Sequence, residues 1–324
     1  MVGFLLSALL VAISAAWYNI LLKKASERFL YSFWVAFFTF VNMTILFYTK
    51  HLMQGMTFSQ TSLYIHSLVT TNTPFFFTVA FLILLQIACK SYMFGRHAVG
   101  KIVPILEIGT PLTAFLYYLL GNHITGIQAV GIGTIALGAM ISGFKTLEFP
   151  NIFKPLLHLH PAIYVYGIAM AFLATSENLC IYLMTKATPV TTMLTTKIQS
   201  LPFLSHFHFS FMSPLEYFEI ASIFFVTGFF VYLLGFTRHT LSSMLAFLKQ
   251  EKRMIFVGAC ANTFSQYVYY YIYEGNKQSI VVALTKFGIP LTLMFAYLTL
   301  KDRILLPEKV GVTLIVVGGI LTSL

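Results

Sequence analysis

Four charged side chains lie well inside apolar segments of this chain of 324 residues: Lys90, Glu107, Glu177 and Lys286. A charge near the middle of a bilayer costs at least about 2.5–3.5 kcal/mol on insertion scales, so such residues usually face a cavity and pair with one another. Within one cavity, a glutamate binds an ammonium group and a lysine binds a carboxylate. We therefore take these four residues as the first candidates for a ligand site, with a zwitterion as the ligand that suits both charges.

The helical rise places these charges at matching depths from the two membrane faces. Glu107 lies ~12 Å and Lys90 ~6 Å from one face, whereas Lys286 lies ~12 Å and Glu177 ~10 Å from the other. We predict two pairs, Lys90 with Glu107 and Glu177 with Lys286. Two alternatives stay open: the pairs are structural salt bridges between helices, or a buried glutamate carries a proton.

Other polar residues within the apolar segments indicate a cavity around the charges. Gln86 precedes Lys90 by four residues, and Gln266 precedes Tyr270 by four, so each pair shares one helix face. The further candidates are Asn178, beside Glu177, and Asn19 in the first segment. For each of them the alternative is a hydrogen bond between helices, which is worth about 0.6 kcal/mol on average.

The sequence gives no sign of a cofactor or a metal centre. It holds no nucleotide-binding motif of the form GxxxxGK[ST]. The pairs His158–His160 and His206–His208 fall in or near loops, without the further ligands that a metal site needs. We expect no cofactor, no metal and no enzymatic activity.

The composition places these residues in a membrane protein. The chain is 58% hydrophobic and only 9% charged, whereas a soluble domain carries about 25% charged residues. Its net charge of +10 sits mostly at segment ends and in loops, where topology and anionic lipid explain it. We therefore expect an integral, multi-pass protein whose partners are the lipid bilayer and a small-molecule substrate, with no nucleic acid.

Apolar runs of about 20 residues are long enough to cross a bilayer as helices. We predict an all-α integral membrane protein with ten transmembrane helices. The predicted spans are 3–22, 30–48, 75–94, 99–120, 124–144, 161–184, 216–236, 254–273, 278–300 and 307–324.

The chain repeats itself after 179 residues. EIGTPLTAFLYYLL at 107–120 returns as KFGIPLTLMFAYLT at 286–299, and glycines of the span after each motif also match. We predict two five-helix repeats, residues 1–150 and 151–324. Because five is odd, the second copy is inverted, a common plan for secondary transporters with the substrate site between the copies. Pro111 and Pro290 fall at the same place in the two copies and are our candidate hinges.

Glycine-rich spans close both copies, at 124–144 and 307–324. Small residues let helix backbones approach closely, and we expect them to pack the chain internally, with a dimer face as the alternative. The oligomeric state stays open between monomer and homodimer.

Both halves carry a proline-bearing helix, a short polar turn and a glycine-rich last helix. The stretches are PLTAFLYYLLGNHITGIQAVGIGTIALGAMISG and PLTLMFAYLTLKDRILLPEKVGVTLIVVGGILTS. This layout resembles the EamA-type branch of the drug/metabolite transporter superfamily, which usually has a Gly-Glu-Arg-like turn here. Lys301-Asp302-Arg303 is close to that turn, whereas Gly121-Asn122-His123 departs from it. The resemblance implies a ten-helix carrier with a central cavity, in a family that moves amino acids, other metabolites, nucleotide-linked sugars and drugs.

The sequence thus predicts a secondary transporter of a small organic metabolite, an amino acid or related zwitterion or cation, working by alternating access. One alternative is an exchanger of a larger metabolite such as S-adenosylmethionine or a nucleotide sugar. An alternative of another class is an integral membrane enzyme that modifies lipid, which would need an acid–base constellation that the sequence does not present.

The basic residues predict an orientation. Loops after the odd-numbered spans, together with the helix ends beside them, hold 14 of the 20 Lys and Arg residues, which places those loops in the cytoplasm and both termini outside. We expect the bacterial inner membrane as the location.

Overall fold

The computed structural model describes residues 2–96, 102, 109–120, 124–142, 161–185, 189–200, 211–237, 239–275, 288–301 and 304–323. Within these ranges every regular element is an α-helix, as predicted. The helices are α1 (Val2–Lys24), α2 (Arg28–Met53), α3 (Phe58–Arg96), α5 (Gly109–Leu119), α6 (Gly126–Ser142), α8 (Pro161–Thr185), α9 (Pro189–Gln199), α10 (Pro214–Phe236), α11 (Leu241–Gly275), α13 (Gly288–Leu300) and α14 (Leu306–Ser323).

Four of these helices are long and apolar enough to cross a membrane, by length and composition. They are Arg28–Met53, Phe58–Arg96, Val165–Thr185 and Pro214–Phe236. Gly126–Gly138 and Gly288–Leu300 are shorter apolar helices. The described part of the chain is therefore all-helical and compatible with a membrane protein, and ten remains the predicted number of spans.

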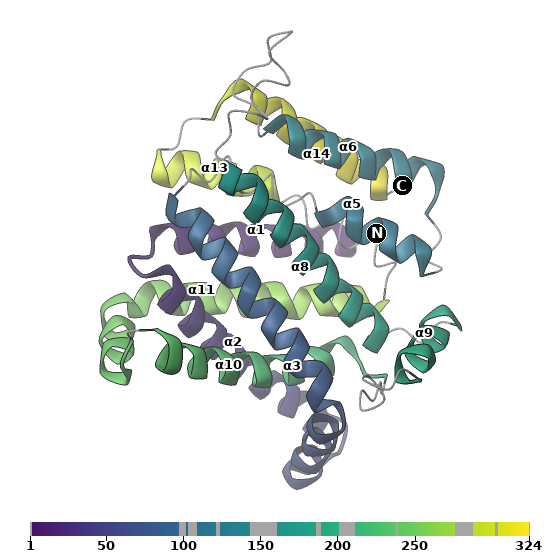
Figure 1. Cartoon of the computed structure of the whole chain (residues 1–324), viewed down its shortest axis with the longest axis vertical. Coiled ribbons are helices and arrows are strands. Elements are labelled where there is room, and N and C mark those ends of the chain that lie inside the picture. Colours follow the sequence, from purple (N-terminus) through teal and green to yellow (C-terminus); the bar gives the residue numbers. More distant parts are fainter. Residues whose placement is uncertain are drawn as a thin grey trace.

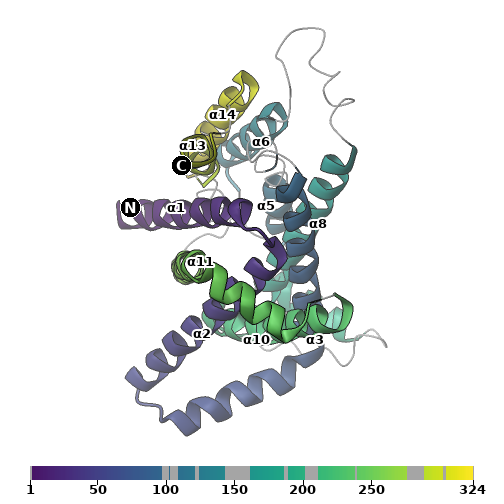
Figure 2. The ribbon, with the colours of Figure 1, turned by 90° about the vertical axis from the view of Figure 1, so that its left-hand side faces the viewer.

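The helices form two groups that face each other. Figure 2 shows α1 and α11 on one side of the molecule and α3, α5 and α8 on the other, with α2 and α10 at the lower end of the view. Contacts support this arrangement: α1 packs against α11 and α13, while α8 packs against α3 and α5. Helices α2 and α10 contact each other, and each also contacts α3 and α11, so they join the two groups.

Two helices begin much earlier than predicted. Helix α3 has 39 residues, or ~58 Å of helix, about twice what a bilayer core requires. The sequence interpretation placed the start of this span at residue 75, because Pro74 and the Ser, Thr and Asn residues before it favour a loop. The helix nevertheless continues through Pro74, with Thr73 Oγ1 and Asn72 Nδ2 donating to helix carbonyls one turn back.

The extra length of α3 pairs with the end of α2. Figure 2 shows the two segments leaving the bundle together as a hairpin. Tyr64 packs at its base with Phe47, and its hydroxyl donates to Glu216 Oε1 at 2.8 Å. Residues 49–74, expected to be a connection, are therefore mostly helical because they pack against α10.

Helix α11 begins at Leu241, although the predicted span began at residue 254. The charged run around Lys249–Arg253 reads as a loop in the sequence. In the structure it is helical, with one interruption at Glu251 (φ −102°, ψ 15°) where the helix kinks. The predicted connection 185–215 likewise contains an unpredicted short helix, α9.

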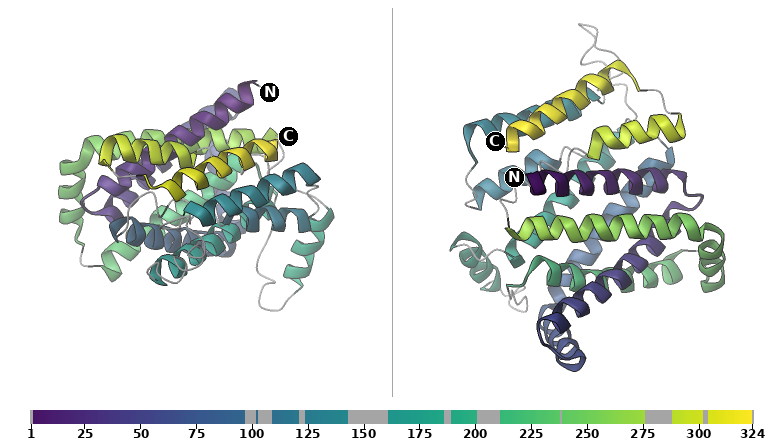
Figure 3. Two further views of the ribbon diagram at one scale, coloured as in Figure 1. Left: turned by 90° about the horizontal axis from the view of Figure 1, so that it is seen from above. Right: turned by 180° about the vertical axis from the view of Figure 1, so that it is seen from behind.

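The glycine-rich helices α6 and α14 pack directly against each other, which confirms the internal packing predicted for them (Figure 3). A Cβ atom added at Gly138 would come within 2.5 Å of the Gly311 carbonyl oxygen, and one at Gly318 within 2.6 Å of the Gly131 carbonyl oxygen. The backbones therefore touch where side chains are missing. Because Gly131 meets Gly318 while Gly138 meets Gly311, the helices run antiparallel.

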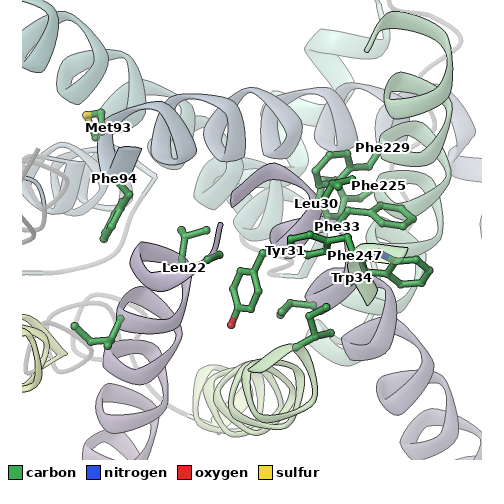
Figure 4. Packing of buried hydrophobic residues seen from close by; sticks show 14 of the residues in the cluster. Leu22, Leu30, Tyr31, Phe33, Trp34, Met93, Phe94, Phe225, Phe229 and Phe247 are labelled. Carbon is green, nitrogen blue, oxygen red and sulfur yellow. The ribbon is translucent and has the colours of Figure 1, made fainter. Parts of the chain in front are cut away.

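Aromatic packing fixes α2 against α10, as Figure 4 shows. Phe33 meets Phe229 edge to face, with ring centroids 5.5 Å apart. Phe225 and Phe229 belong to the same buried cluster as Trp34 and Leu30. Aromatic pairs of this geometry add about 0.5–1.5 kcal/mol beyond the burial of their area, so the wall between α2 and α10 is a rigid part of the fold.

Candidate functional site

A cavity of about 440 Å³ lies between the two groups of helices. Six helices line it: α1, α2, α3, α8, α10 and α11. Its polar lining residues are Tyr18, Asn19, Ser32, Thr39, Gln86, Lys90, Glu177, Tyr217, Ser222, Asn262, Ser265, Gln266 and Tyr270. The volume falls in the range of small-molecule sites, roughly 300–1,000 Å³.

Glu177 and Gln86 meet across two helices in this cavity. Gln86 Nε2, on α3, donates a hydrogen bond of 2.6 Å to Glu177 Oε2, on α8. The contact forms because α3 packs along α8, which aligns the two side chains. A charge-assisted hydrogen bond of this kind orients the carboxylate and still leaves it able to accept further donors.

Lys90 lies one helical turn beyond Gln86, on the same face of α3. Its Nζ atom is 4.9 Å from the centroid of the Tyr18 ring and 5.9 Å from that of Phe94. An ammonium over an aromatic face is attracted by the ring quadrupole. The cavity thus presents one cation and one anion among the lining residues that the structure describes.

Asn19 supplies an acceptor to the cavity. Its Oδ1 atom is buried and has no hydrogen-bond partner among the described residues. Elsewhere in the lining, Asn262 Nδ2 donates to Thr39 Oγ1 at 3.1 Å, which joins α11 to α2. A buried acceptor without a donor costs free energy unless a ligand or water provides one, so Asn19 favours a ligand that donates hydrogen bonds.

The structure brings most of the predicted site residues together. Lys90, Glu177, Gln86, Gln266, Tyr270 and Asn19 all line the cavity. Glu107 and Lys286 lie outside the described residues, and so do the two predicted ion pairs that include them. Among described groups, the partner of Glu177 is Gln86.

Asn178 does not belong to the cavity lining, and here the prediction is wrong. Its Nδ2 atom donates to the Ala174 carbonyl at 2.9 Å, within its own helix. Its backbone carbonyl accepts a hydrogen bond of 3.3 Å from the Tyr117 hydroxyl of α5. Residues adjacent on a helix point about 100° apart, so the neighbour of Glu177 serves packing between α8 and α5 instead.

The candidate hinges occupy corresponding places. Pro111 and Pro290 each follow by two residues the glycine at which α5 and α13 begin, Gly109 and Gly288. Each glycine approaches another helix closely: a Cβ at Gly109 would lie 3.2 Å from the Ala171 backbone, and one at Gly288 3.4 Å from the Ala12 carbonyl. The hinge role of the two prolines stays a prediction.

Sequence reasoning missed a buried carboxyl group. Glu219 on α10 is only 2% exposed, and its Oε1 atom accepts a hydrogen bond of 2.6 Å from Thr44 Oγ1 on α2. Its Oε2 atom is buried and unpartnered within the described ranges. Glu219 lies one turn inside the predicted span that starts at residue 216, and this position was the available signal in the sequence. We interpreted it as part of the polar end of that helix.

Comparison with known proteins gives little further information. No protein-family model matches the chain. The chain is 42% identical over 57 residues to the uncharacterized protein MJ1333.1 of Methanocaldococcus jannaschii. The match spans 18% of this chain and 41% of that relative's length, and the relative's name assigns no activity.

Proposed function

We propose that the protein is a secondary transporter that carries a small organic zwitterion or cation, such as an amino acid, through the central cavity by alternating access. The observation that supports this most is the presence of both Glu177 and Lys90 in the lining of one polar cavity formed by six helices. Ionisable residues inside a membrane protein are functional candidates by default. The proposal includes a bilayer location and no catalytic step.

We infer that the architecture is an inverted repeat, in which α1, α2, α3, α5 and α6 correspond to α8, α10, α11, α13 and α14. The observed helix contacts are consistent with this correspondence. Each contact has a counterpart when every helix is replaced by its equivalent in the other copy. The contact of α1 with α11 corresponds to that of α8 with α3, α1 with α13 to α8 with α5, and α2 with α11 to α10 with α3. All six contacts are observed. Ten spans remain the proposed number, as the sequence repeat predicts.

The crossing of α6 and α14 supports the same two-fold relation. With the repeat in register, Gly131 corresponds to Gly311 and Gly138 to Gly318. The close approach of Gly131 to Gly318 is therefore the two-fold equivalent of the close approach of Gly138 to Gly311. Inverted repeats place a transporter's site at their interface, and the cavity lies between the two proposed copies.

We further propose that the chain is a divergent relative of the EamA-type drug/metabolite transporters, located in a cytoplasmic membrane with its more basic edge inside. The repeated proline and glycine motifs support the resemblance. Two contacts join helix ends that carry basic residues: Lys23 Nζ donates to the Phe94 carbonyl at 2.8 Å, and Ser26 Oγ donates to Glu251 Oε1 at 3.1 Å. These contacts join the end of α1 to the end of α3 and to the kink of α11.

The cavity suggests how the cargo lies. An ammonium group fits the acceptor side formed by Glu177, Gln86 and Asn19. A carboxylate fits Lys90, which is one turn, or ~6 Å along α3, from Gln86. Both groups of one small zwitterion can therefore be engaged at once.

A second candidate cargo is an aromatic cation such as S-adenosylmethionine. Tyr18, Tyr217, Phe218, Phe225 and Tyr270 all line the cavity. Aromatic faces bind cationic groups and stack on planar rings. This candidate uses the same transport mechanism and differs in the ligand.

The test is ligand-induced stabilisation of the purified protein. The panel contains amino acids, S-adenosylmethionine, nucleotide sugars and quaternary amines. A ligand at 100 times its Kd adds about 2.7 kcal/mol of stability and raises Tm. We expect one class to raise Tm in the wild type, and Glu177→Gln and Lys90→Met each to abolish the shift.

Asn178→Ala is the matched control, because Asn178 adjoins Glu177 in sequence but lies outside the cavity lining. It should keep the full ligand shift. A shift that survives both cavity substitutions would overturn the proposed site. No shift with any class, together with no uptake in proteoliposomes, would overturn the proposed function.

A further inference from the structure

The first ten residues of α11 form an amphipathic segment, Leu241–Gln250, that ends at the kink at Glu251. Figure 1 shows this segment crossing the end of the bundle, between the end of α10 and the long part of α11. Leu241 and Leu245 are exposed, and Met244 and Phe247 are buried against the protein. At helical spacing, the segment has three sides. Leu241 and Leu245 form an apolar exposed side, which the half-buried Leu248 continues. Met244 and Phe247 form the buried side, and Ser242, Ser243, Lys249 and Gln250 form the polar exposed side.

This three-sided pattern is that of a helix lying in the plane of a membrane surface. One side packs on the protein, one faces lipid and one faces water. Two contacts hold the segment in place. Trp34 Nε1 donates to the Met244 carbonyl at 3.1 Å, and Ser26 Oγ donates to Glu251 Oε1 at the kink. The segment is thus fixed to α2 and to the turn between α1 and α2.

A groove of about 380 Å³ lies at the kink, between α2 and α11. Phe38, Leu248 and Phe256 form its apolar walls, and Lys252 and Arg253 line it through the carbon atoms of their side chains. Phe256 is 68% exposed, and both basic side chains are exposed as well. Apolar walls beside two cations, at the surface end of a helix, complement a molecule with an acyl chain and an anionic phosphate.

We propose that this groove binds one anionic phospholipid, with an acyl chain along Phe38, Leu248 and Phe256 and its phosphate between Lys252 and Arg253. The guanidinium can bind the phosphate through two hydrogen bonds, and the ammonium adds a point charge. Glu251, which precedes Lys252 in the chain, accepts a hydrogen bond from Ser26 Oγ. The site is separate from the central cavity and does not depend on the proposed transport function.

Its location gives the lipid a structural role. The groove lies on the outer side of the contact between α2 and α11. On the cavity side, the same two helices are joined by the hydrogen bond between Asn262 and Thr39. A lipid bound there braces that wall from outside.

Tryptophan quenching tests the site directly. The chain has two tryptophans, and Trp34 lies beside the groove, with its ring centroid 6.0 Å from that of Phe38. In a Trp17→Phe background, Trp34 is the sole tryptophan reporter. The protein is placed in phosphatidylcholine nanodiscs that contain increasing fractions of a lipid with brominated acyl chains. That lipid is phosphatidylglycerol in one series and phosphatidylcholine in the other, and bromine quenches indole fluorescence at short range.

We expect brominated phosphatidylglycerol to quench Trp34 at roughly tenfold lower mole fraction than brominated phosphatidylcholine, because two cations at a membrane surface favour the anionic headgroup. Lys252→Gln/Arg253→Gln should remove this preference. Lys309→Gln, which removes an exposed lysine at the start of α14, should keep it. Equal quenching by the two lipids in the Trp17→Phe protein would overturn the proposal, and so would a preference that survives the double substitution.

Discussion

Gln86 and Glu177 join α3 to α8 through a hydrogen bond of 2.6 Å, between Nε2 and Oε2, on the wall of the central cavity. This contact fixes the position of the Glu177 carboxyl group in the cavity wall. The amide also keeps its own oxygen as an acceptor. The pair is therefore organised to receive a donor such as an ammonium group, which is the chemistry that the proposed cargo supplies.

Gln86→Leu tests this arrangement. The substitution removes the donor and leaves Glu177 without its observed partner, so we expect a loss of about 1–3 kcal/mol in the free energy of unfolding. Affinity for the ammonium-bearing cargo should fall about 10-fold or more, since hydrogen bonds to charged groups contribute about 1.5–3 kcal/mol. The Tm without cargo reports the change in stability, and the dependence of Tm on cargo concentration reports the change in affinity. Unchanged affinity in a stably folded variant would show that Gln86 does not position Glu177 for binding.

We predict that the buried Glu219 lowers the free energy of unfolding of the protein. It is 2% exposed, with one oxygen bonded to Thr44 and the other unpartnered among the described residues. Replacing a buried, incompletely paired polar group by an apolar one of similar size is often neutral or stabilising. We expect Glu219→Leu to leave Tm unchanged or to raise it.

Thr44→Val should have the opposite effect, because it removes the hydroxyl and leaves the carboxyl group buried. The expected loss is about 1–3 kcal/mol, and it should vanish in the Glu219→Leu background. Denaturant unfolding of the four proteins in detergent measures the coupling. If Thr44→Val costs the same with and without Glu219, the hydrogen bond does not contribute to stability.

The crossing of α6 and α14 predicts a sharp difference between two glycines of one helix. A Cβ at Gly138 would overlap the Gly311 backbone, whereas a Cβ at Gly133 would meet nothing within 4 Å. Gly138→Ala should destabilise the protein by about 1–3 kcal/mol, because the backbones must separate. Gly133→Ala should be neutral or stabilise by about 0.5–1 kcal/mol, because alanine is the better helix former. Thermal unfolding of the two variants side by side measures this, and equal effects would contradict the observed crossing.

The sequence predicted the parts of this structure that depend on spacing and hydropathy. Four-residue spacing placed Gln86 with Lys90 and Gln266 with Tyr270 on common faces, and all four residues line the cavity. The all-helical membrane class followed from composition. Predictions based on polar residues were less successful: the starts of α3 and α11 were missed because polar, proline-bearing or charged runs favour loops locally, whereas packing on α2 and α10 makes them helical.

The remaining misses concern orientation about a helix axis. Asn178 is adjacent to Glu177, but its side chain donates within α8 and it lies outside the cavity lining. Glu219 is buried although it lies only one turn from the polar helix start. Sequence position gives depth along a helix, but the neighbouring helices decide which side chains are buried. The predicted pairs with Glu107 and Lys286 lie outside the described residues and stay predictions.

Tyr31 and Gly258 give a final test of the packing between α2 and α11. A Cβ added at Gly258 would overlap the Tyr31 hydroxyl and lie 3.2 Å from Val35 Cγ2. That hydroxyl is buried and has no hydrogen-bond partner among the described residues. The Tyr31 hydroxyl is therefore the main reason for glycine at 258, and the contacts with Tyr31 Cζ at 3.1 Å and Val35 Cγ2 would remain in a Tyr31→Phe variant.

Gly258→Ala alone should destabilise the protein by about 1–3 kcal/mol through overpacking. Tyr31→Phe alone should be neutral or slightly stabilising, because it removes an unsatisfied buried hydroxyl. The double variant should recover more than half of the loss, a coupling of about 0.5–3 kcal/mol between residues in contact. Denaturant unfolding of the four proteins measures that coupling. Strictly additive effects would mean that the hydroxyl does not occupy the space beside Gly258, and that α2 and α11 pack with a different register in the membrane.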